Sequence, residues 1–170
     1  IEAERLNEEH AVLTAEPTPI VAFVERVCEQ FESYPGGIEL ELPTQDREIV
    51  MDNLRVRLLI TNLVNNAIRH GEGNPIVVRV SFNGDFTHLE VEDNGEGIAE
   101  EHLSQISEPF YRADSSRQRN TGGFGLGLYL CRLIAKAHGG ELLIRSLLGE
   151  GTHVKVKLPP HPPLEELMDK

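Results

Sequence analysis

Two runs of alternating apolar and polar residues, PIVVRVSF at 75–82 and FTHLEVED at 86–93, stand on either side of the tripeptide NGD. Alternation with a period of two is typical of a strand that buries one face, and Asn-Gly between two such runs is a strong signal for a β-hairpin. The sequence therefore predicts two neighbouring antiparallel strands, and the other elements have to be placed around them.

Four further segments predict strands. IELELP sets three apolar side chains against glutamates and predicts a half-buried strand, and EIVM is a shorter candidate. ELLIRS and THVKVKL, joined by LLGEG, predict a closing hairpin. These segments occupy residues 38–43, 48–51, 141–146 and 152–158.

Three segments carry apolar residues at helical spacing. They cover residues 19–31, 52–70 and 128–137, and a short helix is predicted for EEHLSQI at 100–106. Asp52 is placed to cap the second helix and Gly71 to end it. The prolines of TAEPTP mark the segment before the first helix as a connector.

The order of elements is helix, two strands, long helix, hairpin, short helix, loop, helix and hairpin. It lacks the repeated strand–helix alternation of a doubly wound sheet. Antiparallel strands with helices that must share one face indicate an α/β (α+β) two-layer sandwich.

Composition limits the classes of function. The chain has 170 residues, enough for one domain, and a formal net charge of -12, which argues against a general nucleic-acid-binding protein because such proteins present a basic face. No run approaches the roughly 20 apolar residues that span a bilayer. Cys28 and Cys131 form no C-x-x-C motif and predict buried free thiols. The chain begins at Ile1 without a methionine, so we expect a piece of a longer protein.

The second helix carries three asparagines within five positions, although asparagine is a poor helix former. Asn62 and Asn66 lie four residues apart on one face, and Asn65 lies beside that face. Their amide oxygens suit the coordination shell of a hard cation or its waters, and solvated surface residues are the alternative. Arg69 and His70 follow one turn later, where they could reach an anion beside the metal. His70 could equally be a helix-end residue stabilised by the helix dipole.

The strand at 86–93 ends in a glycine-rich turn, DNGEGI. Asp93 could accept a hydrogen bond from an exocyclic amino group such as that of adenine. Gly95 and Gly97 would let the base lie against the backbone without meeting a Cβ. The alternative is an acidic turn in which Asp93 caps the short helix that follows.

A polar segment with little periodicity extends over residues 107–125 and predicts a long mobile loop. Its stretch SEPFYRADSSRQR offers two aromatic anchors, Phe110 and Tyr111, and arginines suited to phosphate oxygens. The arginines are Arg112, Arg117 and Arg119. A solvated loop fixed by Phe110 is the alternative.

This loop ends in NTGGFGLGL, which has four glycines in nine residues directly before a helix. Gly123, Gly125 and Gly127 either form a hinge or let the free N–H groups of the helix N-terminus approach a phosphate. The stretch follows a loop rather than a strand, so it does not predict a dinucleotide fold. The chain holds no G-x-x-x-x-G-K-[ST] loop either.

Taken in order, these stretches resemble the motifs of one family. The sequence resembles the catalytic, ATP-binding domain of bacterial sensor histidine kinases, within the Bergerat-fold ATPases that also include gyrase, heat-shock chaperones and MutL. TNLVNNAIRHG is similar to the N box of that family, DNGEGI to its G1 box, EPFYRAD to its F box and GGFGLGL to its G2 box. SLLGEGTHVKVKLP resembles the last glycine box and closing strand. The resemblance covers residues 18–159 with all boxes in order. It implies the Bergerat ATP-binding fold, whose mixed, mostly antiparallel sheet has its helices on one face.

The resemblance implies a role for each matching residue. Asn66 would coordinate Mg²⁺ bridging the ATP phosphates, with Asn62 supporting it. Asp93 would bind the adenine amino group, and Thr152 would complete the adenine site. Arg112 is the best match for a γ-phosphate contact, and together with the two asparagines it would be catalytic. The other implied cofactor-binding residues are Arg69, His70, Gly95, Gly97, Ile98, Tyr111, Gly123, Phe124, Gly125, Leu126, Gly127 and Leu128.

The resemblance also implies how the parent protein is organised. Residues 1–17 would be the end of a dimerisation helix and a linker, residues 18–159 the catalytic domain with an ATP lid at about 107–125, and residues 160–170 a flexible tail. The γ-phosphoryl group would pass to a histidine of the dimerisation domain and then to an aspartate of a cognate response regulator. None of the seven histidines of this chain stands in an H-E/D-x-x-x-P context, so no acceptor is assigned here.

The same resemblance gives expectations for assembly and location. The isolated domain is expected to be a cytoplasmic monomer. The parent is expected to be a homodimer anchored in the bacterial inner membrane.

One position separates this chain from other members of the superfamily. Hydrolytic members such as gyrase B and MutL, and the anti-sigma serine kinases, carry a glutamate four residues before the metal-binding asparagine, where this chain has Asn62. An amide cannot act as a general base, so the sequence favours phosphotransfer to a protein over hydrolysis. An anti-sigma-type serine kinase, another Bergerat-fold ATPase and a nucleotide-binding module without kinase activity are the alternatives.

Overall fold

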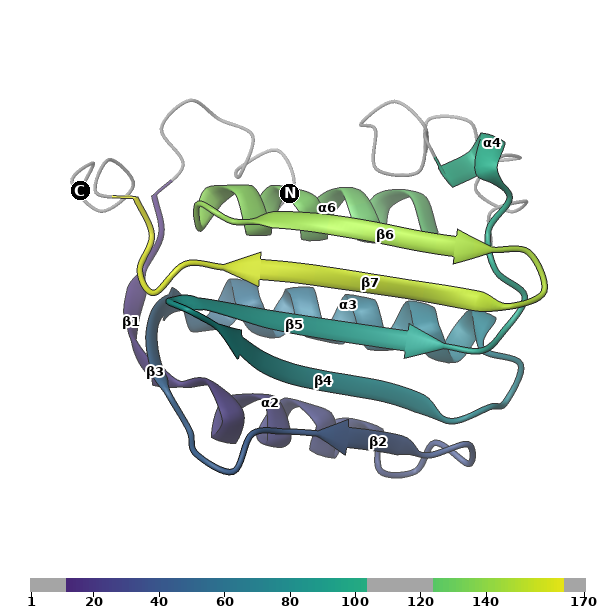
Figure 1. The fold of residues 1–170 in the computed structure, drawn as a ribbon, viewed down its shortest axis with the longest axis horizontal. Helices are drawn as coiled ribbons and strands as arrows, with labels where there is room; N and C mark the ends of the chain where they lie inside the picture. Colours follow the sequence, from purple (N-terminus) through teal and green to yellow (C-terminus); the bar gives the residue numbers. More distant parts are fainter. Residues whose placement is uncertain (1–11, 104–123, 164–170) are drawn as a thin grey trace.

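The computed structural model describes residues 12–103 and 124–163. Its main layer is a five-stranded sheet with the order β2-β4-β5-β7-β6, and helices α2, α3 and α6 cover one face of it (Figure 1). The strands are β2 (Ile38–Glu41), β4 (Ile76–Asn83), β5 (Phe86–Asp93), β6 (Glu141–Leu147) and β7 (Gly151–Leu158). β2 and β4 are parallel, and the other neighbours are antiparallel. The predicted two-layer sandwich with a mixed, mostly antiparallel sheet is confirmed.

The helices of the described chain are α2 (Ile20–Cys28), continued by the 3-10 helix η1 (Glu29–Phe31), α3 (Asn53–His70), α4 (Glu100–Leu103) and α6 (Phe124–Ala137). α3 begins after Asp52, whose carboxylate accepts the N–H of Arg55 at 3.1 Å, so the predicted N-cap is confirmed. Apolar residues of helices and sheet form one core, in which both cysteines are buried and free. Within the described segments, no helix is long and apolar enough to cross a membrane.

The interpretation of TAEPTP as a connector is wrong. Ala15–Pro19 forms β1, which pairs antiparallel with β3 (Glu48–Asp52) in a separate two-stranded sheet. Proline lacks the N–H that a central strand needs, but Pro17 and Pro19 are tolerated because β1 pairs on one side only in the described structure. β1 also crosses residue 17, the predicted end of the linker, and that domain boundary stays a prediction.

The last helix begins earlier than predicted. α6 starts at Phe124 instead of Leu128, so Gly125 and Gly127 lie inside it rather than before it. Helix propensity disfavours glycine, but α6 packs closely against α3 here, and a Cβ placed on Gly127 would lie 3.4 Å from Nδ2 of Asn66. At this point tertiary packing outweighs local propensity.

Candidate nucleotide-binding site

Asn66 lies on the buried side of α3, opposite the first turns of α6. It is 7% exposed, and its Nδ2 has no hydrogen-bond partner among the described residues. A buried amide without a partner costs free energy, so its presence calls for an explanation such as a ligand. Rotation exchanges the amide oxygen and nitrogen, so the group can offer either an oxygen to a cation or an N–H to a phosphate. Asn66 therefore fits the predicted magnesium site.

Asp93 ends β5 on the side of the sheet that faces the helices. It is buried, its Oδ1 accepts the N–H of Gly95 at 2.9 Å, and its carboxylate also accepts a backbone hydrogen bond from Thr152 on β7. Burial raises the pKa of the Asp93 carboxyl above its ordinary value, and the two backbone hydrogen bonds oppose that rise. No ion pair of Asp93 lies within the described structure, so its lone pairs are available to an amino-group donor.

The turn after Asp93 is pressed against two other elements. A Cβ on Gly95 would collide with the carbonyl oxygen of His70, and one on Gly97 would collide with that of Leu147. Gly97 also has φ +74°, a conformation that glycine adopts without strain. Packing of backbone on backbone thus already requires both glycines. Their role in shaping an adenine pocket stays a prediction.

Thr152 is joined to the same turn through Ser146. The Oγ of Ser146 donates to the carbonyl oxygen of Gly151 at 2.9 Å, accepts the N–H of Ile98 at 2.8 Å and lies 2.8 Å from Oγ1 of Thr152. Because a serine hydroxyl has one proton, Thr152 is the donor in the last contact. Sequence reasoning missed Ser146. Its position opposite Thr152 in the closing hairpin was the available signal.

His70, at the end of α3, is tied to the turn as well. Its Nδ1 lies 2.8 Å from Oε1 of Glu96, and the N–H of Glu96 donates to the carbonyl oxygen of His70 at 3.2 Å. His70 is buried, whereas the Glu96 side chain is largely exposed. Glu96 was also missed from the sequence, although it stands within the DNGEGI stretch.

The structure brings several predicted site residues together. Asn66 faces Gly127 across the two helices, His70 contacts the turn that contains Gly95, and Asp93 accepts a hydrogen bond from Thr152. Ile98 is buried and held by Ser146.

The other predicted residues divide by position. Asn62 is half-buried, Arg69 is exposed, and Leu128 is fully buried in the core. Phe124, Gly125 and Leu126 form the first residues of α6. Tyr111, Arg112, Gly123 and almost all of the predicted lid at 107–125 lie outside the described residues, as does the end of the helix predicted at 100–106.

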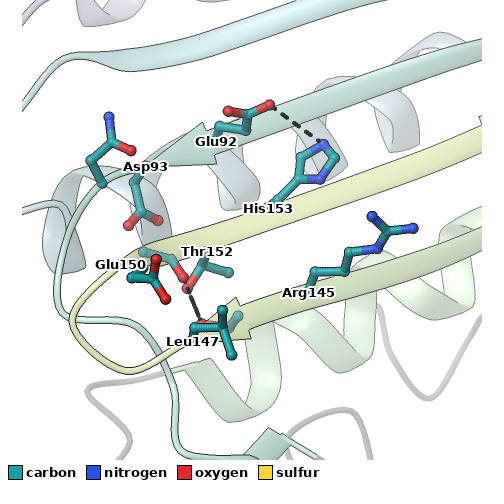
Figure 2. A pocket seen from close by; sticks show the side chains of 10 residues that line it. Glu92, Asp93, Arg145, Leu147, Glu150, Thr152 and His153 are labelled. Atoms are coloured by element: carbon teal, nitrogen blue, oxygen red, sulfur yellow. Dashed lines mark hydrogen bonds and ion pairs between the residues drawn. The ribbon is translucent and has the colours of Figure 1, made fainter.

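A cavity of about 200 Å³ lies at the ends of these strands, and Asp93 and Thr152 are among the residues that line it. Glu92, Arg145 and His153 line it as well, and Figure 2 shows these three side chains on the side of the sheet away from the helices. The sequence predicted Asp93 and Thr152 as site residues, but it did not predict the other three.

Comparison with known protein families identifies the family of this chain. Residues 51–162 match the family described as histidine kinase-, DNA gyrase B-, and HSP90-like ATPase. The chain belongs to this family.

Individual relatives show which members of this family the chain is similar to. The sensor protein SrrB of Staphylococcus aureus is 33% identical over 159 residues, which are 91% of this chain and 27% of SrrB. The chain thus spans little more than a quarter of the length of these curated relatives. The predicted resemblance to the ATP-binding catalytic domains of sensor histidine kinases is confirmed.

Solved structures agree in fold. Full-length ShkA in complex with AMPPNP has a TM-score of 0.75 and 25% identity, covering 95% of this chain and 34% of ShkA. The histidine kinase AdeS of Acinetobacter baumannii has a TM-score of 0.74 at 22% identity, covering 94% of this chain and 74% of that one. The predicted fold is confirmed by these likenesses.

Proposed function

We propose that this domain binds Mg²⁺–ATP and transfers the γ-phosphoryl group to a histidine of a separate dimerisation domain, which passes it to an aspartate of a response regulator. The observation that carries the proposal is the buried amide of Asn66. Its Nδ2 has no partner among the described residues, and it faces the first turns of α6. The family to which the chain belongs supports ATP as the ligand.

The triphosphate lies between α3 and α6 in this proposal. The start of a helix offers N–H groups and partial positive charge to an anion, and Gly127 leaves room beside Asn66 because it has no side chain. Asn66 holds Mg²⁺, with Asn62 supporting it, and the ion neutralises charge on the phosphates. Arg69 and His70 contact phosphate from the end of α3.

The lid supplies further contacts in the proposal. We place it at residues 107–125, with Tyr111 against the nucleotide and Arg112 on the γ-phosphate. The backbone from Gly123 to Leu128 approaches the phosphates. A guanidinium suits this role because it donates two parallel hydrogen bonds to phosphate oxygens.

The adenine lies at the ends of β5 and β7. Asp93 accepts from the exocyclic amino group, since its buried carboxylate lacks an ion pair in the described structure. Thr152 completes the contact, Ile98 offers an apolar surface, and Gly95 and Gly97 keep the turn close to the base.

Asn62 favours phosphotransfer over hydrolysis. It is half-buried on α3 one turn before Asn66, where hydrolytic relatives carry a glutamate. Phosphoryl transfer depends mainly on positioning and charge neutralisation, so an amide suffices at this position when the acceptor is a histidine ring nitrogen, which attacks through its lone pair without a general base. Anti-sigma-type serine kinases also carry the glutamate, which makes that alternative the weaker one.

The parent protein is proposed to be a homodimer anchored in the bacterial inner membrane, with this domain on the cytoplasmic side and monomeric when isolated. The relative SrrB is a sensor protein. This supports a signalling role for the parent of the present chain.

The test mixes the 170-residue chain with the dimerisation domain of its parent, Mg²⁺ and ATP labelled on the γ-phosphate. The expected result is acid-labile, base-stable label on the dimerisation domain, and no label when EDTA is present from the start of the reaction. Acid-stable label on a serine points to the serine kinase. Release of free phosphate without transfer points to a hydrolytic ATPase, and either outcome overturns the proposal.

A further inference from the structure

Three pairs of facing residues run along the helix pair α3–α6. Hydrogen bonds join Asp52 to His138 and Leu59 to Cys131, and Asn66 faces Gly127, where an added Cβ would lie 3.4 Å from its Nδ2. Residue numbers rise along α3 while they fall along α6, so the two helices are antiparallel. With a rise of 1.5 Å per residue, the Asp52 contact and the Asn66 contact lie about 20 Å apart, at opposite ends of the pair.

His138 follows directly after α6 and is 2% exposed. Its Nδ1 lies 2.9 Å from the carbonyl oxygen of Ile134, and its Nε2 lies 3.0 Å from the backbone nitrogen of Asp52. Because a carbonyl only accepts and an amide N–H only donates, the ring is neutral, with its proton on Nδ1. Burial lowers the pKa of His138, which keeps Nε2 an acceptor.

Asp52 is a fixed point at the other side of this contact. Its Oδ1 accepts the N–H of Arg55 at 3.1 Å, and its Oδ2 accepts Nη1 of Arg55 and the N–H of Thr14, both at 2.9 Å. Arg55 also donates to the carbonyl oxygen of Val12 at 3.0 Å. These hydrogen bonds hold the start of α3 against the segment directly before β1, so the contact with His138 ties the end of α6 to a part of the chain that is itself held in place.

The other packing contacts of α6 are mainly apolar and do little to fix its position along α3. Its most deeply buried residues are Leu128, Cys131, Ile134 and Ala135. Apolar contacts are non-directional, whereas a hydrogen bond prescribes both a distance and an angle. The hydrogen bond from Sγ of Cys131 to the carbonyl oxygen of Leu59, at 3.6 Å, involves a weak thiol donor. The stronger contact at the Asp52 end can therefore determine how far α6 is shifted along α3.

We propose that Asp52 and His138 are positioning residues for the nucleotide site. Their hydrogen bond fixes the axial position of α6 on α3, and with it the position of the first turns of α6 beside Asn66, where the phosphates bind. This inference rests on the function proposed above. The two helices meet closely here, since a Cβ on Gly127 would be in van der Waals contact with Asn66, 3.4 Å from its Nδ2. A misplacement of about 1 Å at such a site can cost about a hundredfold in activity.

The first test compares ATP affinity in three variants of the chain at a temperature where all are folded. His138→Phe keeps a ring but removes the acceptor for the Asp52 N–H, and we expect ATP to bind about tenfold more weakly. His138→Gln can accept the same N–H through its amide oxygen and is expected to restore most of the affinity. His161→Phe makes the same change at an exposed histidine outside α3 and α6, and wild-type affinity is expected there.

The second test needs no variant. Val50 and Asp52 lie on one edge of β3, but the N–H of Val50 donates to the carbonyl oxygen of Pro160 and that of Asp52 to His138. Coupling between two sites is reciprocal, so saturating Mg²⁺–ATP should slow hydrogen exchange of the Asp52 amide by a larger factor than that of the Val50 amide. This measurement decides the question if His138→Phe does not fold.

The outcomes separate the two proposals. ATP binding to the wild type, with unchanged affinity in folded His138→Phe or with equal slowing of the two amides, overturns the positioning role alone. Loss of affinity in both His138→Phe and His138→Gln also counts against the positioning role. In that case the glutamine, which can accept the Asp52 N–H as His138 does, fails to restore ATP binding. Failure of the wild type to bind ATP overturns the proposed function, and this inference with it.

Discussion

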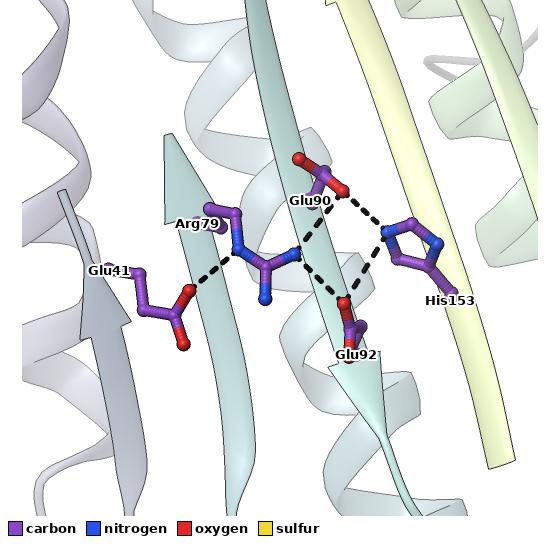
Figure 3. Close-up of polar contacts among 5 residues, drawn as sticks. All are labelled: Glu41, Arg79, Glu90, Glu92 and His153. Carbon is purple, nitrogen blue, oxygen red and sulfur yellow. Dashed lines mark hydrogen bonds and ion pairs between the residues drawn. The ribbon is translucent and has the colours of Figure 1, made fainter. Parts of the chain in front are cut away.

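The two faces of the sheet belong to the same strands, but they differ in how completely their polar and charged side chains are partnered. On the face away from the helices, Arg79 donates to Glu41 at 2.7 Å, to Glu92 at 2.9 Å and to Glu90 at 3.3 Å (Figure 3). The Nε2 of His153 lies 2.7 Å from Glu90. Each of these carboxylates has a cationic or histidine partner, so the cluster is compensated within the protein.

On the helix-covered face, two of the candidate site residues are less completely compensated. Asp93 is the neighbour of Glu92, but it has no ion pair within the described structure, and burial raises the pKa of its carboxyl. Asn66 has an Nδ2 without a partner there. A fold that leaves such groups buried loses stability that a bound ligand can restore, so incomplete compensation marks the ligand side.

The face away from the helices, called the open face below, also shows why closely spaced donor atoms do not by themselves define a metal site. Donor atoms of Glu90, Glu92 and His153 lie within 4.8 Å of one another, as ligands of one ion would. Arg79 already donates to both glutamates and brings a positive charge to the place where the ion would sit. We therefore assign no metal to this cluster.

The largest expected effect comes from removing the unpartnered amide. Asn66→Ala should abolish Mg²⁺–ATP binding, with affinity reduced by about a hundredfold or more, because both the metal ligand and a phosphate neighbour are lost. Calorimetric titration with ATP and Mg²⁺ measures this. Asn65→Ala is the matched control, since Asn65 is adjacent but exposed. Wild-type affinity in Asn66→Ala would remove the amide from the site.

A smaller effect is expected from a pair of neighbours that face opposite sides. Asp93→Asn replaces one acceptor oxygen by a donor and should weaken ATP binding about 10- to 100-fold while reducing selectivity for ATP over GTP. Glu92→Gln makes the same chemical change one residue earlier, on the open face, and should leave both quantities unchanged. Titrations with ATP and GTP test both variants. Equal losses in the two variants would show that the faces are not distinct in function.

The sequence predicted the elements that local pattern controls. The hairpin of β4 and β5 was found within about one residue, because alternation and an Asn-Gly turn are local signals. The N-cap at Asp52 was found for the same reason. The candidate residues Asn66, Asp93 and Thr152 were found through motif order, and the structure buries all three.

What the sequence did not predict depends on contacts between distant segments. β1 was missed because Pro17 and Pro19 are read as a loop unless its edge position is known. The start of α6 was misplaced because glycine is disfavoured in helices, whereas α6 continues through Gly125 and Gly127 where it packs against α3. Ser146 and His138 act through partners that become neighbours only in the folded chain.

A third prediction isolates the close packing of the turn beside Asp93. Gly97 and Gly149 both have positive φ, but a Cβ on Gly97 would collide with the carbonyl oxygen of Leu147, while one on Gly149 has nothing within 4 Å. Gly149→Ala should lower the free energy of unfolding by about 1 kcal/mol through backbone strain alone. Gly97→Ala should lower it by about 3 kcal/mol, since overpacking adds to the same strain. Urea denaturation measures both, and equal losses would mean that the turn can move away from β6.

The smallest effect is expected on the open face, where a substitution tests whether the cluster around Arg79 is independent of ATP binding. Arg79→Met removes the central cation, whose side chain is 28% exposed, while Glu90 keeps His153 as a partner. Partly exposed ion pairs contribute little, so the free energy of unfolding should fall by about 1 kcal/mol or less, and the difference from wild type should shrink as salt is added. ATP affinity should stay at the wild-type value, because the cluster points away from the helices that hold Asn66. A loss of ATP affinity in Arg79→Met without global unfolding would mean that strain passes through β5 from one face to the other, and the separation of a compensated face from a ligand face would then fail.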